Sequence, residues 1–251
     1  MNISIITVSY NSSKTIRESI ESVNNLDYQN LEHVFIDGKS SDNTLEIINE
    51  FSTRKKTVIC EKDKGIYDAF NKGVNNTKGD IVGFLHSDDT FAANDILDQV
   101  ISVFSKYQDV DGVYGDLMYV DKLNTNKVIR YWKSKVFNQN LLKKGWMPAH
   151  PTLFLKKEIY DKHGSFDLNY KVSADYDFMV RILKDSELNF KYLPQVVTKM
   201  KVGGNSNRSL SNIIKKSRED FEIIKKNKIG GFVTLLQKNL SKISQFKMYN
   251  K

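Results

Sequence analysis

Residues 80–91 read DIVGFLHSDDTF, an apolar run that stops at two adjacent carboxylates. The run Ile81–Leu85 is typical of a strand buried on both faces, as in a parallel sheet covered by helices. Asp88 and Asp89 repel each other, and neither has an obvious partner nearby in the sequence unless a cation arrives from outside. An acidic pair at a strand end also serves as a helix cap, so the stretch alone leaves both interpretations open.

Similar apolar, β-branched runs recur on both sides of this stretch, with amphipathic segments between them. This alternation predicts an α/β fold with a mostly parallel central sheet flanked by helices. The predicted strands of the first half are Ile3–Ser9, Glu32–Asp37, Thr57–Glu61, Asp80–His86 and Gly112–Val120. The predicted helices of this half are Ser13–Asn25, Asp42–Arg54, Ile66–Asn76 and Asn94–Tyr107.

The alternation becomes less regular after Tyr119, and the sequence ends in a C-terminal helical extension. In order, we expect a hairpin over residues 117–132, a loop near residues 142–154, a helix over Asp175–Asp185, a short strand near Lys191–Val197, a Gly- and Asn-rich loop over residues 201–210, and helices over Ser211–Lys226 and Gly231–Phe246.

The composition is that of a globular protein, with 40% hydrophobic and 27% charged residues in a chain of 251. No run of ~18 apolar residues occurs, and the N-terminal MNISIITVSY has neither a basic segment nor a cleavage site, so we expect no membrane span and no secretory signal. Cys60 is the only cysteine, and the four histidines show no zinc-binding spacing. These observations favour a cytoplasmic protein.

The net charge of +8 is concentrated at the C-terminus, where residues 212–251 hold ten Lys and Arg against three Asp and Glu. A nucleic-acid-binding protein would more often carry this charge on its folded face, so we expect no nucleic-acid partner. The basic segment 229–251 also has an apolar stripe, formed by Phe232, Leu236, Leu240 and Ile243. Such a segment binds an anionic membrane surface, or it packs on its own domain or on a second subunit in a homodimer.

Polar side chains follow each of the first two predicted strands: Thr7, Tyr10 and Asn11 after the first, and Asp37 after the second. Ligands of open α/β sheets bind beyond the carboxyl ends of the strands, where these residues can stack on a planar base and hydrogen-bond to it. A strand end with an Asn turn is the simpler interpretation of the first group. Neither GxGxxG nor GxxxxGK[ST] occurs, which argues against dinucleotide and P-loop sites.

Asp88 and Asp89, taken together with these strand ends, predict a site for Mg²⁺ or Mn²⁺ that bridges the oxygens of a nucleotide diphosphate. The cation would relieve the repulsion within the pair and stabilise charge on a departing diphosphate. Asp175 and Asp177 lie near the start of a predicted helix, where an acid can accept a proton from an incoming hydroxyl. Capping of that helix is the alternative.

Six segments in order, TVSYN (7–11), DGKSSDNT (37–44), DKGIYDAFNKG (63–73), FLHSDD (84–89), AHPTLF (149–154) and ADYDF (174–178), resemble the family 2 glycosyltransferases of the GT-A fold. Within that family, the chain looks most like the colanic-acid-type enzymes that build bacterial surface polysaccharides. The resemblance covers about residues 1–205. It implies a GT-A domain over 1–205, with a nucleotide-sugar-binding half (1–120) and an acceptor half (121–205), followed by the basic helical extension 206–251.

The resemblance also implies roles for individual residues. Thr7, Tyr10 and Asp37 match positions that hold the uracil and its ribose. Asp88 and Asp89 match the metal and ribose site, and Asp175 matches the catalytic base. The segment that borders the nucleotide-sugar pocket corresponds to Asp63, Lys64, Gly65, Tyr67, Asp68, Asn71 and Lys72. Lys72 would offer charge to a phosphate, unless it is an ordinary surface lysine of an amphipathic helix.

The chain departs from the family pattern at two positions. His86 replaces the first acid of the metal-binding triplet, so metal binding rests on Asp88 and Asp89, with or without help from the imidazole. Ala174 replaces the Glu before the base, which leaves Asp175 as the only acid there unless Asp177 substitutes. His150 is assigned either to the acceptor or diphosphate site, or to the core.

Together these features predict a metal-dependent, inverting transfer of a sugar from a UDP-sugar to a hydroxyl of a lipid-linked saccharide acceptor, at the inner face of the cell membrane. The loop Val202–Arg208 is expected to close over the donor and exclude water. Two rival functions remain: a nucleotide-sugar-binding protein whose catalytic site has decayed, and a nucleic-acid-binding protein that uses the basic tail.

Overall fold

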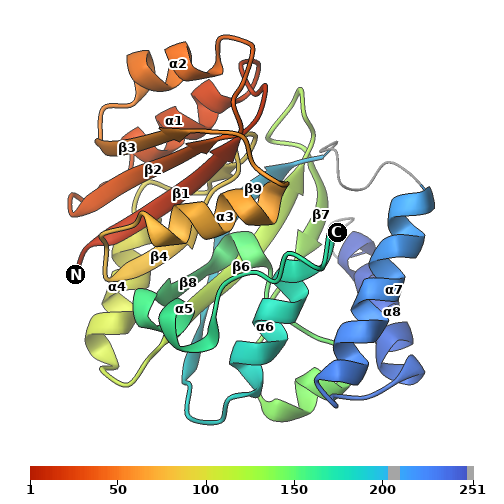
Figure 1. The fold of residues 1–251 in the computed structure, drawn as a ribbon. Helices are drawn as coiled ribbons and strands as arrows, with labels where there is room; N and C mark the ends of the chain where they lie inside the picture. The colour runs from red at the N-terminus through yellow and green to blue at the C-terminus, as the bar shows by residue number, and fades with distance from the viewer. Residues whose placement is uncertain (203–209, 248–251) are drawn as a thin grey trace.

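The computed structural model describes residues 1–202 and 210–247. One sheet forms its centre, in the strand order β3-β2-β1-β4-β8-β6-β9-β5, with β7 paired to β6 (Figure 1). The strands are β1 (Ile3–Ser9), β2 (Leu31–Asp37), β3 (Lys55–Cys60), β4 (Ile81–Phe84), β5 (Thr90–Phe91), β6 (Gly112–Val120), β7 (Val128–Trp132), β8 (Leu153–Lys156) and β9 (Phe190–Lys201). The α-helices are α1 (Ile16–Asn24), α2 (Thr44–Phe51), α3 (Ile66–Asn75), α4 (Ile96–Lys106), α5 (Lys157–His163), α6 (Ala174–Lys184), α7 (Leu210–Lys226) and α8 (Phe232–Lys247), and two 3₁₀ helices are η1 (Gln139–Lys144) and η2 (His150–Thr152).

The first half of the sheet is parallel, as its apolar runs predict. β1 pairs in parallel with both β2 and β4, and β2 pairs in parallel with β3. In the second half β8 runs antiparallel to β4 and β6, while β9 is parallel to β6. The predicted α/β class, the flanking helices and the C-terminal helices are confirmed.

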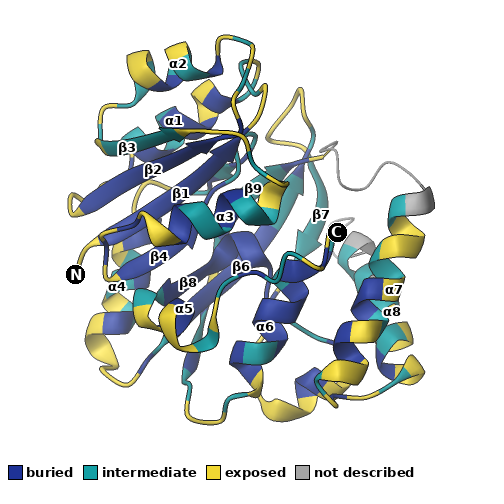
Figure 2. Ribbon diagram, in the orientation of Figure 1, coloured by how far each residue is buried: buried dark blue, intermediate teal, exposed yellow. Residues whose placement is uncertain are grey.

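Helices cover both faces of the sheet, so the strands are buried on both sides (Figure 2). Alternate residues of β1 enter different cores: Ile6 and Val8 pack with residues of α3 and α6, whereas Ile3 and Ile5 pack with residues of α4. Because β1 is buried on both faces, apolar residues occur on both of them and the sequence does not alternate between apolar and polar. The edge at the strand ends therefore rests on a rigid, well-packed base.

Two predicted strand ends needed correction. β4 ends at Phe84 and not at His86, because the chain turns at residues 86–89, where the N–H of Asp89 donates to the carbonyl of His86. β9 continues to Lys201, beyond the predicted end at Val197, because β6 pairs with it as far as Val120. Lys201 is therefore strand and not loop. Residues 203–208 of the predicted closing loop lie outside the described residues.

The two C-terminal helices pack on the rest of the protein, α7 beside α6 and α8 beside β7 and η1 (Figure 1). The apolar stripe of α8 faces outward: Phe232 is 70% exposed, Leu236 48% and Leu240 52%. Its inward side holds the buried Thr234 and Lys238 and also Leu235, which packs against the core. Of the alternatives for this segment, packing on its own domain is observed, through a largely polar side of the helix.

One buried histidine gives the fold a defined pH dependence. His33 on β2 is fully buried, its ring packs on Phe35, and burial lowers its pKa to about 3. Below pH ~6.5 the unfolded chain therefore binds a proton that the folded protein does not. We expect this histidine to cost about 2 kcal/mol of unfolding free energy between pH 7 and pH 5.

Urea unfolding at the two pH values measures this loss, with His33→Gln as the non-titrating comparison. The variant is expected to lose about 2 kcal/mol less than the wild type over the same interval. Equal losses in both proteins would contradict the assignment.

Candidate active site

The carboxyl ends of β1, β2 and β4 lie at one edge of the sheet, because these strands are parallel neighbours. Ser9 pairs with Asp37 at the last position of the β1–β2 register. The turn after β4 reaches the same edge, where the Oγ of Ser87 lies 3.0 Å from the Oγ of Ser12. The polar residues predicted at separate strand ends are thus brought together.

Asp37 anchors the turn after β2. Its carboxylate is fully buried and accepts hydrogen bonds from the Oγ of Ser9 (2.8 Å) and from the Oγ (2.6 Å) and backbone N–H (2.7 Å) of Ser40. Both oxygens are therefore engaged by serines of the same edge, and the turn is held in one conformation.

An aromatic ring and a carboxylate meet beside Gly38. A Cβ atom at this position would lie 2.6 Å from the Oδ2 of Asp63 and 3.3 Å from the ring of Tyr10, so a larger residue would displace the Asp63 carboxylate. Tyr10 is 65% exposed, and Asp63 uses its other oxygen to accept a bond from the N–H of Gly65 (2.9 Å). An exposed ring beside a free carboxylate oxygen suits a nucleobase, which stacks on one and donates an N–H to the other.

Thr7 and Asn11 lie at the same edge but contact protein groups. Thr7 is fully buried, with its hydroxyl 2.9 Å from the Nε2 of His33. Asn11 adopts a left-handed backbone conformation (φ 49°), and its Oδ1 accepts a bond from the N–H of Ser41 (2.9 Å). Asn11 thereby ties the β1 end to the turn that follows β2.

Most of the segment 63–73 holds α3 in place. The left-handed Gly65 (φ 121°) precedes the helix, and the N–H of Lys64 donates to the Oδ2 of Asp68 (2.9 Å). Lys72 pairs with Glu61 (2.9 Å) and with Asp68 (3.5 Å). The positive charge of Lys72 is therefore already balanced by two carboxylates.

Asn71 and Tyr67 connect α3 to the second half of the chain. The amide of Asn71 both donates to the carbonyl of Phe166 and accepts from its N–H, each at 2.9 Å. The hydroxyl of Tyr67 lies 2.9 Å from the carbonyl oxygen of Val172 and 3.0 Å from the Oδ1 of Asp175. Burial and the carboxylate of Asp175 hold the pKa of Tyr67 well above its ordinary value, so its hydroxyl is a neutral donor.

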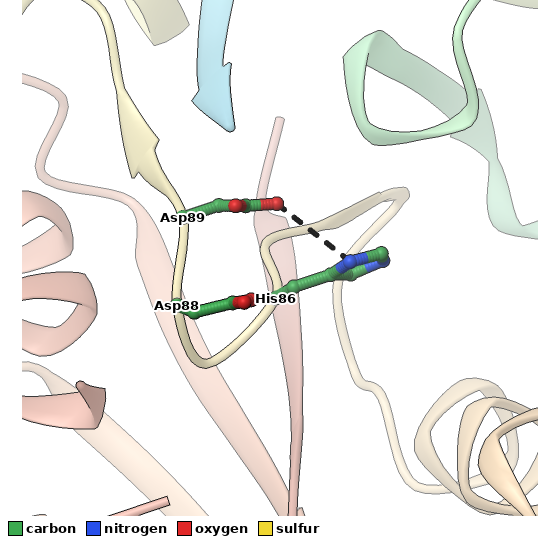
Figure 3. A group of neighbouring side chains, drawn as sticks. All are labelled: His86, Asp88 and Asp89. Carbon is green, nitrogen blue, oxygen red and sulfur yellow. Dashed lines mark ion pairs between the residues drawn. The ribbon is translucent and has the colours of Figure 1, made fainter. Parts of the chain in front are cut away.

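His86, Asp88 and Asp89 project in the same direction from the turn after β4 (Figure 3). Their ligand atoms all lie within 4.8 Å of one another. Asp89 is fully buried, and its Oδ2 is 3.6 Å from the Nδ1 of His86, too far for a hydrogen bond. β5 follows Asp89 directly, so the helix-cap interpretation of the acidic pair is wrong.

The electrostatics of this group fit a divalent cation. Burial and the neighbouring Asp88 raise the pKa of Asp89 well above its ordinary value, and burial lowers that of His86. Within the described residues, the Oδ2 of Asp89 and the Nε2 of His86 have no hydrogen-bond partner. Two carboxylates and an imidazole suit Mn²⁺ or Mg²⁺, which would supply the missing positive charge.

Asp175 and Asp177 have different surroundings on α6. Asp175 lies in the first turn, partly exposed, where Tyr67 donates to it. Asp177 is fully buried, and its Oδ2 accepts a bond from the Nε of Arg181 (2.8 Å). The fold thus leaves Asp175 as the accessible acid and uses Asp177 in an internal ion pair.

His150 lies in an aromatic cluster, with ring centroids 4.8 Å from Phe84, 5.5 Å from Phe70 and 5.4 Å from Phe166. Burial lowers its pKa to about 4, and the smaller influences on it come from Asp175 and His86. His150 is therefore a neutral core residue that also adjoins the two acidic groups of the edge.

Tyr119 on β6 shows that these acidic groups share one region. Burial is the largest cause of the raised pKa of its phenol. Arg130 opposes the shift, and Asp89 and Asp175 both add to it. One ring therefore lies within electrostatic reach of the turn after β4 and of α6. No sequence pattern pointed to Tyr119.

Three features have now been described: the buried Asp89, whose Oδ2 has no hydrogen-bond partner within the described residues, the exposed ring of Tyr10, and the partly exposed acid Asp175 on α6. The sequence model of the family described as Glycosyl transferase family 2 matches residues 4–164, which span every strand end described above. The chain belongs to glycosyl transferase family 2. The family resemblance inferred from the six motifs is confirmed.

The sequence of this glycosyltransferase is similar to those of two named relatives. The PGL/p-HBAD biosynthesis glycosyltransferase of Mycobacterium bovis (strain BCG / Pasteur 1173P2) is 29% identical over 208 residues, 81% of this chain and 78% of the relative. The UDP-Glc:alpha-D-GlcNAc-diphosphoundecaprenol beta-1,3-glucosyltransferase WfgD of Escherichia coli is 31% identical over 189 residues, 74% of this chain and 72% of the relative.

Solved structures share the fold of this glycosyltransferase. S. aureus TarS 1-349 in complex with UDP-GlcNAc has a TM-score of 0.70 at 18% identity, over 90% of this chain and 65% of the TarS chain. The mannosyltransferase PcManGT from Pyrobaculum calidifontis, in complex with GDP-Man and Mn2+, has a TM-score of 0.68 at 18% identity, over 99% of this chain and 70% of the other. At this level of identity the similarity concerns the fold.

The glycosyltransferase fold also positions Asp175 through a residue that the sequence did not single out. Glu219 on α7 is buried, and its carboxylate accepts the backbone N–H groups of Lys171 (3.0 Å), Val172 (2.8 Å) and Ser173 (2.9 Å). The three residues that carry these amides directly precede α6. In the sequence Glu219 looks like any acid of an amphipathic helix, because its partners are more than forty residues away.

Glu219→Ala is expected to lower the unfolding free energy by about 2 kcal/mol, because three backbone N–H groups lose a charged acceptor. In the transferase assay, kcat should fall with little change in the dissociation constant of the nucleotide, and Glu219→Gln should restore part of it. Glu222→Ala, an exposed acid of the same helix, is the matched control. An effect of Glu222→Ala equal to that of Glu219→Ala would contradict the positioning role.

Proposed function

We propose that the chain catalyses a metal-dependent, inverting transfer of a sugar from a UDP-sugar to a hydroxyl of a saccharide acceptor. The observation that carries the proposal is the group of His86, Asp88 and Asp89, whose ligand atoms lie within 4.8 Å of one another, together with the partly exposed Asp175, which Tyr67 holds by a hydrogen bond of 3.0 Å. A transferase needs these two features together, a base for the acceptor and a charged site for the leaving diphosphate.

In this proposal, Tyr10 and Asp63 receive the base beside Gly38, and Asp37 with Thr7 and Asn11 keeps the edge in shape. Asp88 and Asp89, with His86, would hold Mn²⁺ or Mg²⁺. When bound, the cation supplies positive charge against the diphosphate of the donor. The nucleotide-sugar pocket would be supported by His150 in the aromatic cluster and by the segment before and within α3: Lys64, Gly65, Asp68, Asn71 and Lys72.

The transfer itself follows from the chemistry of Asp175. Its carboxylate removes the proton of the acceptor hydroxyl, and that oxygen attacks the anomeric carbon from the face opposite the nucleotide. The bond from the anomeric carbon to the diphosphate oxygen breaks, UDP leaves with the bonding electrons, and the configuration inverts. Tyr67 keeps the Asp175 carboxylate oriented by donating to its Oδ1, which supports catalysis by positioning.

The donor is tested by a panel of UDP-glucose, UDP-galactose, their N-acetyl forms and GDP-mannose, with Mn²⁺ and with EDTA. We expect nucleotide release from a UDP-sugar that stops in EDTA. UDP is favoured because TarS binds UDP-GlcNAc and WfgD is named for UDP-Glc, while the PcManGT complex with GDP-Man makes the guanosine donor the necessary comparison. Nucleotide binding without product from any donor would instead support a non-catalytic binding protein.

For the acceptor we propose a lipid-linked saccharide in surface polysaccharide biosynthesis, met by the protein at the cytoplasmic face of the cell membrane. The name of WfgD specifies a diphosphoundecaprenol-linked sugar. The exposed apolar stripe of α8 in a basic segment supports docking on an anionic membrane. No helix in the described part of the chain is long and apolar enough to cross a membrane. We retain 1–205 as the transferase domain and 206–251 as its extension.

Membrane docking predicts co-sedimentation with vesicles that contain anionic lipid, weakened by salt. Leu236→Ser combined with Leu240→Ser should reduce the bound fraction severalfold, since both side chains leave the acyl boundary. Sedimentation that is unchanged by the double substitution would contradict this role for the stripe. A change from dimer to monomer in the same variant would assign the stripe to a second subunit instead.

A further inference from the structure

Four cations gather where α7 and α8 meet β7: Arg130, Lys216, Lys238 and Lys242, called here the α7–α8 cation cluster. Asp220 is the acid at its centre, with a side chain only 1% exposed. The Nζ of Lys238 lies 2.6 Å from its Oδ2, and the Nζ of Lys216 lies 3.6 Å from its Oδ1. One buried carboxylate thus faces several positive charges.

Asp220 pairs with Lys238 and Lys216, whereas Lys242 forms no ion pair within the described residues. The Nζ of Lys242 lies 3.5 Å from the Oδ1 of Asn239. Burial lowers the pKa of Lys242, with Lys216 adding to the shift. Burial also lowers the pKa of Lys238 to about 7, although the carboxylate of Asp220 opposes this shift. A partly buried group of like charges is costly unless an anion joins it.

The cluster adjoins Asp175 on the side of the C-terminal helices. Lys216 lies 3.4 Å from the Oγ of Ser173, and Lys238 lies 3.3 Å from the ring centroid of Tyr176, so both flank the first turn of α6. Arg130 stacks over Tyr119 at 4.6 Å and donates to the Oε1 of Gln245 on α8. Asp175 lies between Ser173 and Tyr176 in the sequence of this turn, so the cluster borders the turn that carries Asp175.

We propose that the α7–α8 cation cluster binds the phosphate groups of the acceptor while the acceptor hydroxyl reaches Asp175. This inference rests on the proposed function and specifies its substrate class, a saccharide joined to a diphosphate. In the proposed function, the donor diphosphate binds instead at the turn after β4, where Asp88 and Asp89 would hold a metal ion. An acceptor with phosphate next to its sugar contacts Asp175 and the cluster together, and its phosphate supplies the anion that Lys242 lacks within the described residues.

The kinetic test compares two synthetic acceptors, the same sugar attached to the same alkyl chain through a diphosphate or through an uncharged linker. Wild-type protein is expected to use the diphosphate acceptor with the lower KM. Lys242→Ala should raise that KM about tenfold, the scale of one charge-assisted hydrogen bond, and leave the KM of the uncharged acceptor alone. Lys242→Arg should restore most of the difference, and Lys215→Ala, an exposed lysine of α7, is the matched control.

A binding measurement separates this inference from the proposed function. Decyl diphosphate is titrated in EDTA without donor, with decyl sulfate as the comparison of equal chain length, and the shift of the unfolding midpoint is recorded. Wild type should bind the diphosphate more tightly, and Lys242→Ala should bind it about tenfold more weakly. If the two probes bind alike, or if Lys242→Ala weakens UDP affinity and not acceptor affinity, the inference is overturned. If no donor yields product but the diphosphate still binds at the cluster, the proposed function fails and the anion site stands.

Discussion

Asp175→Asn is expected to lower kcat roughly 10³-fold, the scale of a lost general base. Asparagine keeps the size of the side chain and still accepts the hydrogen bond from Tyr67, but it does not take up the acceptor proton. The affinity for UDP, measured by calorimetry with Mn²⁺, should change less than twofold, because the change affects only the proton transfer. Steady-state product formation at saturating donor measures the loss.

Asp177→Asn is the matched control, an identical change two residues further along α6. Its carboxylate pairs with Arg181 inside the protein, so the substitution should lower the unfolding midpoint and leave the kcat of the folded fraction within a few-fold of wild type. If Asp177→Asn abolished turnover while Asp175→Asn retained it, the two roles would have to be exchanged.

Asp89→Ala is expected to reduce kcat/KM roughly 10³-fold, since stabilisation of a leaving diphosphate by a divalent ion is worth several kcal/mol. The variant should also lose the Mn²⁺ dependence of UDP binding, because Asp88 and His86 alone offer too few charged ligands. Full activity in this variant would contradict the metal assignment. Asp98→Ala, which removes an exposed acid from α4, should behave as the wild type.

The same position predicts an opposite effect on stability. In the metal-free protein, the Oδ2 of Asp89 is buried without a hydrogen-bond partner among the described residues. Asp89→Asn removes the buried carboxylate at equal size, so we expect the metal-free variant to be at least as stable as metal-free wild type. If Asp89 is a functional residue that destabilises the fold, the variant should lose activity while its unfolding free energy stays the same or increases. A clear loss of stability would indicate a structural acid instead.

The strands that carry a clear local pattern of their own could be predicted well. Ile3–Ser9 and Gly112–Val120 agree residue for residue with β1 and β6, because runs of β-branched residues between turn signals depend on local pattern. β4 and β9 differ because their ends are set by the partner strand and not by composition. Val82 pairs with Leu155, and Leu117 pairs with Thr198, contacts that no local window contains.

The candidate site divides in the same way. Asp88, Asp89 and Asp175 stood out because acids at a strand end or helix start are locally unusual. Tyr119 and Glu219 did not, since each looks ordinary where it stands and acquires its part only from residues far along the chain. Lys72 is the opposite case. Its place in the motif suggested that its charge was available to a phosphate, but in the structure it is paired with Glu61 and Asp68.

The sequence by itself determined the α/β class, the family and the acids at the strand ends, because alternation of apolar residues and short motifs are local properties of the chain. Tertiary structure decided which of those acids remain accessible, and it turned α8 so that Lys238 points inward to Asp220 while Leu236 and Leu240 face outward. Hydrophobicity alone would have buried the opposite face. The reason for the difference is that an ion pair and a hydrogen bond depend on where a distant partner lies, which periodicity does not encode.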